Sequence, residues 1–230
     1  MNTLKYDIRV SDELYVRNPD RSKLGQNIIS NGIELMHELG FESFTFKKLS
    51  VKIGSPESSI YRYFENKHML LLYLNNWYWS WMEYRIILSI LNIGSPVEKL
   101  NKAIEVLLMP VVKDSSISYI DEVLLYKLIV AESGKVMHTK DVDIENKKGF
   151  FEAYKYMVNR VASIVLEVNP DCIYPRMLIS TIIEGVHQQR YFLEHLPELT
   201  DGKQNEDSIS IFYKEFLNKM INLNTNKNNN

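Results

Sequence analysis

Apolar side chains recur every three or four positions along most of the chain, which is the spacing of one buried face of an α-helix. The first clear run extends from Ile28 to Leu39 and is followed by Gly40, a residue type that commonly ends a helix. A second, shorter run begins after Thr45, whose hydroxyl can cap a helix, and stops at Gly54. Because no strand pattern and no internal repeat emerges, the sequence predicts an all-α fold.

Two further caps follow the glycine turn. Ser55 is placed to cap a third, short helix, with Pro56 at its first position, where the missing N–H of proline costs little. Asn66 can cap a fourth helix that extends to about residue 92. The remaining apolar pattern predicts five more helices, at about 96–112, 118–134, 144–168, 175–195 and 207–223. Residues 1–20 are either an arm or a short extra helix, and we expect the Asn-rich residues 224–230 to be disordered.

The composition supports a packed helical protein. Of the 230 residues, 45% are hydrophobic and only nine are glycine, which suits long helices better than a turn-rich β fold. The one cysteine, Cys172, excludes an internal disulfide and a multi-cysteine zinc site. The formal net charge of -2 gives no sign of a nucleic-acid binder at the level of the whole chain. Residues 17–68, however, carry eight basic and six acidic side chains, so this segment has a small positive excess.

Enzyme and membrane functions are disfavoured by the sequence. The five histidines form no His-Glu-x-x-His pair, and Cys172 has no recognisable activating base. Polar and charged residues interrupt the most apolar stretch, 69–91, so we expect no membrane span. Residues 1–21 lack the apolar core of a secretory signal. We therefore expect a cytoplasmic protein with no catalytic residues, no metal and no cofactor.

Residues 24–72 have the organisation of a DNA-binding helix-turn-helix. Two helices are separated by a turn around Gly54, and the second, short helix would enter the major groove. This spacing alone is a weak indicator, because helical hairpins with a central glycine are common. The residues within it are more specific: Leu39-Gly40-Phe41, Thr45, Leu49, Gly54, Ile60-Tyr61-Arg62-Tyr63-Phe64-Glu65-Asn66-Lys67 and Leu70-Leu71.

This order of residues resembles the N-terminal pattern of the tetracycline-repressor (TetR) family of bacterial transcriptional regulators, over about a fifth of the chain. The resemblance implies a three-helix DNA-binding domain at 21–68, joined by a long helix to a helical ligand-binding and dimerisation domain at 69–223. It also implies a homodimeric repressor on a palindromic double-stranded DNA operator. A small ligand would release the repressor by moving the fourth helix.

Carried over by position, the resemblance implies a DNA-contacting surface on the second and third helices. Lys47 and Tyr61 would contact phosphates, as would Lys67 at the start of the fourth helix. Arg62 could form a bidentate contact with guanine. The full set of expected DNA-binding residues is Thr45, Lys47, Lys48, Glu57, Ser58, Ser59, Tyr61, Arg62, Tyr63 and Lys67. The alternatives are a solvated face for the two neighbouring lysines and a core position for the tyrosines.

Glu57 departs from the family, which often has a polar or basic residue at this position. A carboxylate on a recognition helix repels phosphates unless it accepts from a cytosine amino group or pairs with a lysine. Ser55-Pro56 is a second departure, since the family usually has Val-Ser after the turn glycine. The sequence therefore does not specify the operator, and Glu57 favours weak non-specific affinity.

Aromatic side chains crowd the fourth helix and later segments. An apolar cavity lined by them would suit a hydrophobic or aromatic ligand, although an aromatic stripe is often simply core. The candidate pocket residues are Trp77, Trp81, Tyr84, Tyr119, Tyr126, Phe151 and Tyr154. They do not identify the ligand.

The two closing helices are amphipathic, and in the TetR family such a pair packs against its copy in a dimer. The candidate dimer residues are Ile179, Ile183, Val186, Arg190, Phe212 and Phe216. Alternatively, these residues complete the core of the monomer. We predict a ligand-released homodimeric repressor. The competing hypothesis, motivated by Glu57, is a helical interaction or scaffold protein that keeps the fold and has lost specific DNA binding.

Overall fold

The computed structural model describes residue 8 and residues 10–113, 119–203 and 207–225, and all regular structure within them is helical. This confirms the all-α fold. The chain forms two compact units, each described by itself below. Unit 1 comprises residues 1–81 and 111–154, and unit 2 comprises residues 82–110 and 155–230. The units therefore group the predicted DNA-binding segment with residues 111–154, which lie far away in the sequence.

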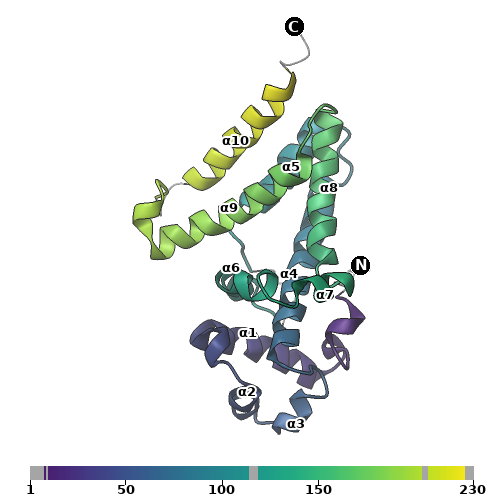
Figure 1. The fold of residues 1–230 in the computed structure, drawn as a ribbon, viewed down its shortest axis with the longest axis vertical. Coiled ribbons are helices and arrows are strands. Elements are labelled where there is room, and N and C mark those ends of the chain that lie inside the picture. The colour runs from purple at the N-terminus through teal and green to yellow at the C-terminus, as the bar shows by residue number, and fades with distance from the viewer. Residues whose placement is uncertain (1–7, 9, 114–118, 204–206, 226–230) are drawn as a thin grey trace, which may run out of the picture. The chain divides into compact units, whose positions relative to one another are not determined.

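Unit 1 holds two short 3-10 turns, the DNA-binding helices and two later helices. Its elements are η1 (Asp12–Leu14), η2 (Pro19–Arg21), α1 (Lys23–Ser43), α2 (Phe46–Ile53), α3 (Glu57–Ile60), the first part of α4 (Lys67–Ile90), α6 (Glu122–Met137), α7 (Val142–Lys147) and the start of α8 (Glu152–Val168). Figure 1 shows α1, α2 and α3 grouped near the beginning of α4. Since α6 packs against α1, the group formed by α1, α2 and α3 is supported by a helix from later in the chain.

Side-chain caps define the DNA-binding helices as the sequence predicted. The Thr45 hydroxyl accepts from the Lys48 amide at 3.2 Å and begins α2. The Asn66 side chain accepts from the Met69 amide at 2.9 Å at the start of α4. Gly54 ends α2 with a φ of 62°, a left-handed conformation that glycine adopts without strain.

The predicted start of α3 is wrong by one residue. Ser55 does not cap this helix, because its amide donates to the Ser50 carbonyl at 3.1 Å and so completes the end of α2. Pro56 instead stands at the N-cap with extended backbone, φ -58° and ψ 142°, and α3 begins at Glu57 without a side-chain cap.

The long helix predicted at 144–168 is also wrong, because the structure divides it into α7 and α8. The break is at Gly149, whose φ is 81°. A positive φ cannot continue a right-handed helix, and glycine adopts it readily. The preceding helix, α6, begins after Asp121, whose carboxylate accepts from the amides of Val123 and Leu124.

Unit 2 contains the end of α4, α5 (Pro96–Leu108), most of α8, α9 (Pro175–His195), η3 (Pro197–Leu199) and α10 (Ser208–Thr225). Figure 1 shows α10 running beside α9, and the two helices are in contact. One face of α10 is buried through Ile209, Tyr213, Leu217 and Ile221. Because α10 continues to Thr225, residues 224 and 225 of the predicted tail are helical, and residues 226–230 lie outside the described part of the chain.

Candidate nucleic-acid interface

The expected phosphate and base contacts lie on exposed parts of α2 and the residues around α3. Lys47, Ser58 and Arg62 are exposed, and Glu57 and Ser59 are half-buried. Within the described chain, neither the Lys47 ammonium nor the Arg62 guanidinium forms a hydrogen bond or an ion pair. Both cations are therefore free to meet an anionic partner such as a DNA backbone.

Lys48 and Thr45 have structural partners of their own. The Lys48 ammonium donates to the Ser43 carbonyl at 2.7 Å, at the C-terminal end of α1. The Thr45 hydroxyl is the cap of α2. Both residues are exposed, so they lie at the surface while also fixing the turn between the first two helices.

Lys67 is held inside the DNA-binding unit. Its ammonium donates to the carbonyls of Phe41, Glu42 and Phe44 at 2.9, 3.0 and 3.2 Å, and it lies 4.6 Å from the centroid of the Phe41 ring. An ammonium group has three protons to donate, so these carbonyls use them all. These bonds tie α4 to the end of α1, and the phosphate contact expected of Lys67 stays a prediction.

Tyr63 is a core residue. Its side chain is 3% exposed, and its hydroxyl shares a 2.8 Å hydrogen bond with the hydroxyl of Ser22, the N-cap of α1. The alternative interpretation of this tyrosine, a core position, therefore fits the structure, and Tyr63 leaves the candidate interface.

Tyr61 remains at the surface, with 48% of its side chain exposed. Its ring meets the Phe46 ring edge to face, with centroids 5.1 Å apart. Its hydroxyl donates to the Glu57 carboxylate at 3.3 Å. Slight burial, and then the nearby Glu57 charge, raise the pKa of Tyr61, so its proton is retained at neutral pH.

Two contacts that the sequence did not indicate join α6 to the end of α1. The Glu132 carboxylate accepts from the Phe41 amide at 2.9 Å, and Lys135 forms an ion pair with Glu42. The hydrogen bond from Lys135 lowers the pKa of Glu42. These residues are separated by about ninety positions, so no local pattern could have paired them.

A third unexpected contact holds the segment that precedes α1. The Asp20 carboxylate accepts from the hydroxyls of Tyr73 and Tyr119, at 2.8 and 2.7 Å. Tyr73 is fully buried in α4, and this burial, followed by the Asp20 charge, raises its pKa well above the usual value. Tyr119, an expected pocket residue, thus connects the start of α6 to η2.

Of the other six expected pocket residues, three are buried (Trp77, Trp81 and Phe151) and three are half-buried (Tyr84, Tyr126 and Tyr154). Trp77 and Trp81 are each 1% exposed, and their rings stack with centroids 6.2 Å apart. Tyr154 packs on Trp79 with centroids 4.3 Å apart. Of the seven candidates, Tyr84 belongs to unit 2 and the other six belong to unit 1.

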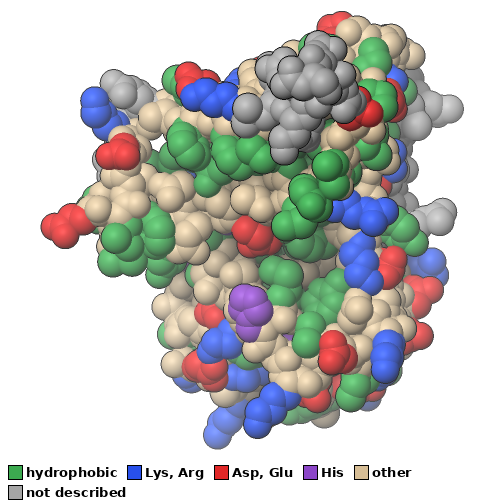
Figure 2. Space-filling model, turned by 45° about the horizontal axis from the view of Figure 1, so that its top comes forward, with side chains coloured by type: hydrophobic (Ala, Val, Ile, Leu, Met, Phe, Trp, Pro, Cys, Tyr) green, Lys and Arg blue, Asp and Glu red, His purple; other side chains and the backbone are tan. Residues whose placement is uncertain are grey.

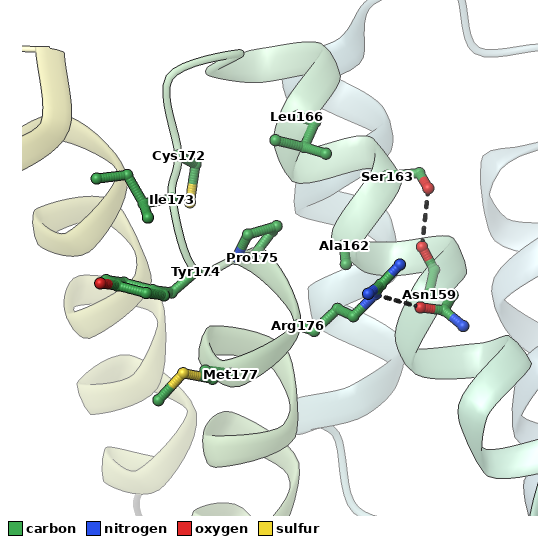
Figure 3. Close-up of a pocket in the computed structure, with 10 residues that line it drawn as sticks. All are labelled: Asn159, Ala162, Ser163, Leu166, Cys172, Ile173, Tyr174, Pro175, Arg176 and Met177. Atoms are coloured by element: carbon green, nitrogen blue, oxygen red, sulfur yellow. Dashed lines mark hydrogen bonds between the residues drawn. The ribbon is translucent and has the colours of Figure 1, made fainter.

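Two of the cavities among the described residues lie in unit 2, and neither of these two is lined by the expected pocket residues. The larger, of about 500 Å³, lies between α8 and the start of α9 and is lined by Leu166, Tyr174 and Met177 among others. Figure 3 shows Arg176 at its edge, where the guanidinium donates to the Asn159 side chain at 2.7 Å. The smaller, of about 240 Å³, lies beside Phe212 and Tyr213 of α10.

The expected dimer residues divide between core and surface. Ile179, Ile183 and Val186 of α9 are at most 2% exposed and form the core of unit 2. Arg190 donates to the Leu108 carbonyl. On the outer face of α10, by contrast, Phe212 is 59% exposed and stacks on Phe216.

On the face drawn in Figure 2, basic and acidic side chains are interspersed, in keeping with the formal net charge of -2. The described residues contain no group of three His, Cys, Asp or Glu side chains that could hold a metal ion. None of their helices has the length and apolar character needed to cross a membrane.

Comparisons with known proteins agree with the geometry. Residues 28–74 match the family model of the bacterial regulatory proteins of the tetR family. The fold is similar to that of AibR in complex with isovaleryl coenzyme A and operator DNA, with 14% identity, 83% of this chain and 94% of that chain covered, and a TM-score of 0.55. Apo AibR is also similar, with 13% identity, 84% and 95% covered, and a TM-score of 0.47.

No curated protein matches the sequence, and at these identities the solved structures show the fold alone. The family match spans most of α1, the whole of α2 and α3, and the start of α4, including the glycine turn and the Tyr-x-x-Phe-x-x-Lys motif. Residues 28–74 therefore have the sequence of the helix-turn-helix segment that the tetR family of bacterial regulatory proteins shares.

Proposed function

We propose that this protein is a homodimeric transcriptional regulator that binds a palindromic operator and leaves it when a small molecule binds. The observation that carries the proposal is the exposed surface of α2 and the residues around α3, where the Lys47 ammonium and the Arg62 guanidinium form no hydrogen bond or ion pair with described residues. The similar AibR was solved with operator DNA and an acyl-coenzyme A, which supports DNA and a small molecule as partners. The bacterial chromosome lies in the cytoplasm, so we place the protein there.

Contacts with DNA divide by chemistry. Lys47 would meet a phosphate, which supplies affinity on any sequence. Ser58 and Arg62, on the exposed side of the recognition segment, would contribute near the bases. The proposed DNA-binding domain is 21–68, and the proposed ligand-binding and dimerisation domain is 69–223.

Release would pass through the contacts that α6 makes with α1. A ligand that moves α6 or α4 would disturb the bond from the Phe41 amide to Glu132 and the Lys135–Glu42 ion pair. The ligand shifts the protein only if its affinity differs between the two conformations, and DNA must then weaken ligand binding by the same factor.

The test is binding to the DNA upstream of the protein's own gene across a series of salt concentrations. We expect the logarithm of the affinity to fall linearly with the logarithm of salt concentration, because each phosphate contact releases counterions. Lys47→Ala should reduce the slope by about one on every sequence. Lys147→Ala, which removes an exposed lysine from α7, is the control and should leave the slope unchanged.

Absence of specific binding at about 50 mM salt contradicts the proposal. A folded protein with that behaviour would instead support the helical scaffold hypothesis.

A further inference from the structure

The side chain of Glu57, the first residue of α3, forms one hydrogen bond within the described chain. Its carboxylate accepts a 3.3 Å hydrogen bond from the Tyr61 hydroxyl, and no cation pairs with it. One oxygen is therefore engaged by Tyr61, and the other keeps its full capacity to accept. This open acceptor stands on the segment that would enter the major groove.

The lysines of α2 do not neutralise this carboxylate. Lys48 donates to the Ser43 carbonyl at 2.7 Å. Lys52 pairs with Glu34 at 3.0 Å and with Glu38 at 3.5 Å. Of the two ways in which a carboxylate can be tolerated on a recognition helix, a lysine partner and a base amino group, the structure leaves the second.

Tyr61 fixes the direction of the carboxylate. Its ring is held edge to face against Phe46, with centroids 5.1 Å apart, and Phe46 is 4% exposed. A rigid ring that donates its hydroxyl to Glu57 limits the rotamers open to that side chain. A positioned acceptor loses less conformational freedom on binding than a mobile one.

We propose that Glu57 is a specificity-determining residue that accepts a hydrogen bond from the N4 amino group of a cytosine in each half-site of the operator, with Tyr61 as its positioning residue. This inference rests on the proposed function. Cytosine presents a donor in the major groove, whereas adenine presents its N6 donor beside the N7 acceptor, which repels a carboxylate. The same negative charge disfavours contact with DNA wherever that cytosine is missing.

The experiment is a selection of binding sites from a random double-stranded DNA library, carried out with the full-length protein and four variants. The wild type should select a C·G pair at one position of each half-site, about ten-fold over the other pairs. Glu57→Gln should shift that position towards A·T, because an amide can bind adenine N6 and N7 together. Glu57→Ala should lose the preference.

Two further variants test whether the preference depends on the base contact of Glu57, on its negative charge alone, or on its positioning by Tyr61. Glu65→Gln removes the same charge from an exposed residue just beyond α3 and should leave the selected site unchanged. Tyr61→Phe keeps the carboxylate and loses the hydroxyl, so it should weaken the preference for cytosine without replacing it. Circular dichroism of each variant shows that the fold is retained.

The outcomes distinguish this inference from the proposed function. If the wild type selects a defined site in which no C·G pair responds to Glu57→Gln, the role of Glu57 is overturned and the regulator function stands. If Glu65→Gln has the same effect as Glu57→Gln, charge alone acts and the base contact is overturned. If the wild type selects no site at all, both are overturned.

Discussion

The ammonium group of Lys67 is used within the protein. Three carbonyls near the end of α1 share its protons, and these carbonyls belong to the turn that orients α2. A charged donor in such a place stabilises the fold before it can serve a phosphate. Lys47 differs, since it makes no such contact.

We therefore expect one lysine substitution to lower the stability of the fold and another to weaken DNA binding. Lys67→Met keeps the apolar stem and removes the donor, and should lower the free energy of unfolding by about 2 kcal/mol, as expected for hydrogen bonds to a charged group. Lys47→Ala should leave the stability unchanged within about 0.5 kcal/mol and weaken DNA binding on all sequences. Urea denaturation followed by circular dichroism measures the first effect, and equal stability of the two variants would contradict this role of Lys67.

Between Tyr63 and Lys67, the type of a residue predicts only in part whether its side chain lies in the core or at the surface. The helical phase places Phe64 in the core, and the structure agrees, with no exposed surface on that side chain. Tyr63 and Lys67 carry polar groups that suit either DNA or the interior, and their partners Ser22 and Phe41 are more than twenty residues away in sequence. A local pattern cannot choose between such alternatives, because tertiary contacts decide them.

At the scale of the helices, Gly185 of α9 lies directly against Tyr213 of α10. A Cβ added there would lie 2.1 Å from the Tyr213 hydroxyl oxygen and 2.8 Å from the ring carbon that carries it. Tyr213 is 7% exposed, so its ring has little room to move. The two helices can approach this closely because residue 185 has no side chain.

Gly185→Ala should destabilise unit 2 by about 1–3 kcal/mol through overpacking. Tyr213→Phe removes the hydroxyl, which is the nearest obstacle, so the double variant should recover part of the loss. A double-mutant cycle from urea denaturation tests this coupling. Strictly additive free energies would show that the two positions do not meet.

Helix α9 also carries His187, a titratable side chain whose protonation opposes folding. Burial, and then the Arg190 charge, lower the pKa of His187 to about 4. The unfolded value is about 6.5, so between these pH values the unfolded chain binds more protons. The free energy of unfolding should therefore fall as the pH decreases, by about 1–2 kcal/mol between pH 7.5 and pH 5.

Urea denaturation at these two pH values measures the effect. His187→Gln should flatten the dependence, because the amide does not titrate. His37→Gln, at an exposed position of α1, is the control and should keep the slope of the wild type. An unchanged slope in the His187 variant would contradict the assignment.

Helix ends follow from sequence where a side chain or a glycine marks them locally. Thr45, Gly54 and Asn66 are such markers, and the structure uses all three. Gly149 is also a marker, but the apolar spacing on its two sides continues without interruption, so the break between α7 and α8 was missed. At Ser55 the backbone amide completes the end of α2, and α3 begins two residues later, at Glu57.

For the molecule as a whole, the outer face of α10 is the part of the proposed dimer interface that the monomer leaves exposed. Phe212→Asp places a charge on this face and should convert a dimer into a monomer at micromolar concentration, since burying an unpaired charge is costly. Light scattering coupled to size-exclusion chromatography measures the mass. Asn218→Asp, on another exposed part of α10, should remain dimeric.

A wild type that is monomeric at about 100 μM would contradict the dimer itself. A dimer that survives Phe212→Asp would place the interface on another surface. The sequence indicated that α10 is amphipathic. It could not show that Ile179, Ile183 and Val186 of α9 are buried in the monomer core, because their burial depends on which neighbour each face of the helix meets.

The two tyrosine hydroxyls on Asp20 also set an order of events during synthesis. Asp20 leaves the ribosome 99 positions before Tyr119. The helix-turn-helix can form early, because N-terminal segments fold first during translation. The segment before it, however, has only the hydrogen bond from Tyr73 to Asp20 until Tyr119 has been made. The segment that precedes α1 therefore reaches its full anchorage only after Tyr119 has been made.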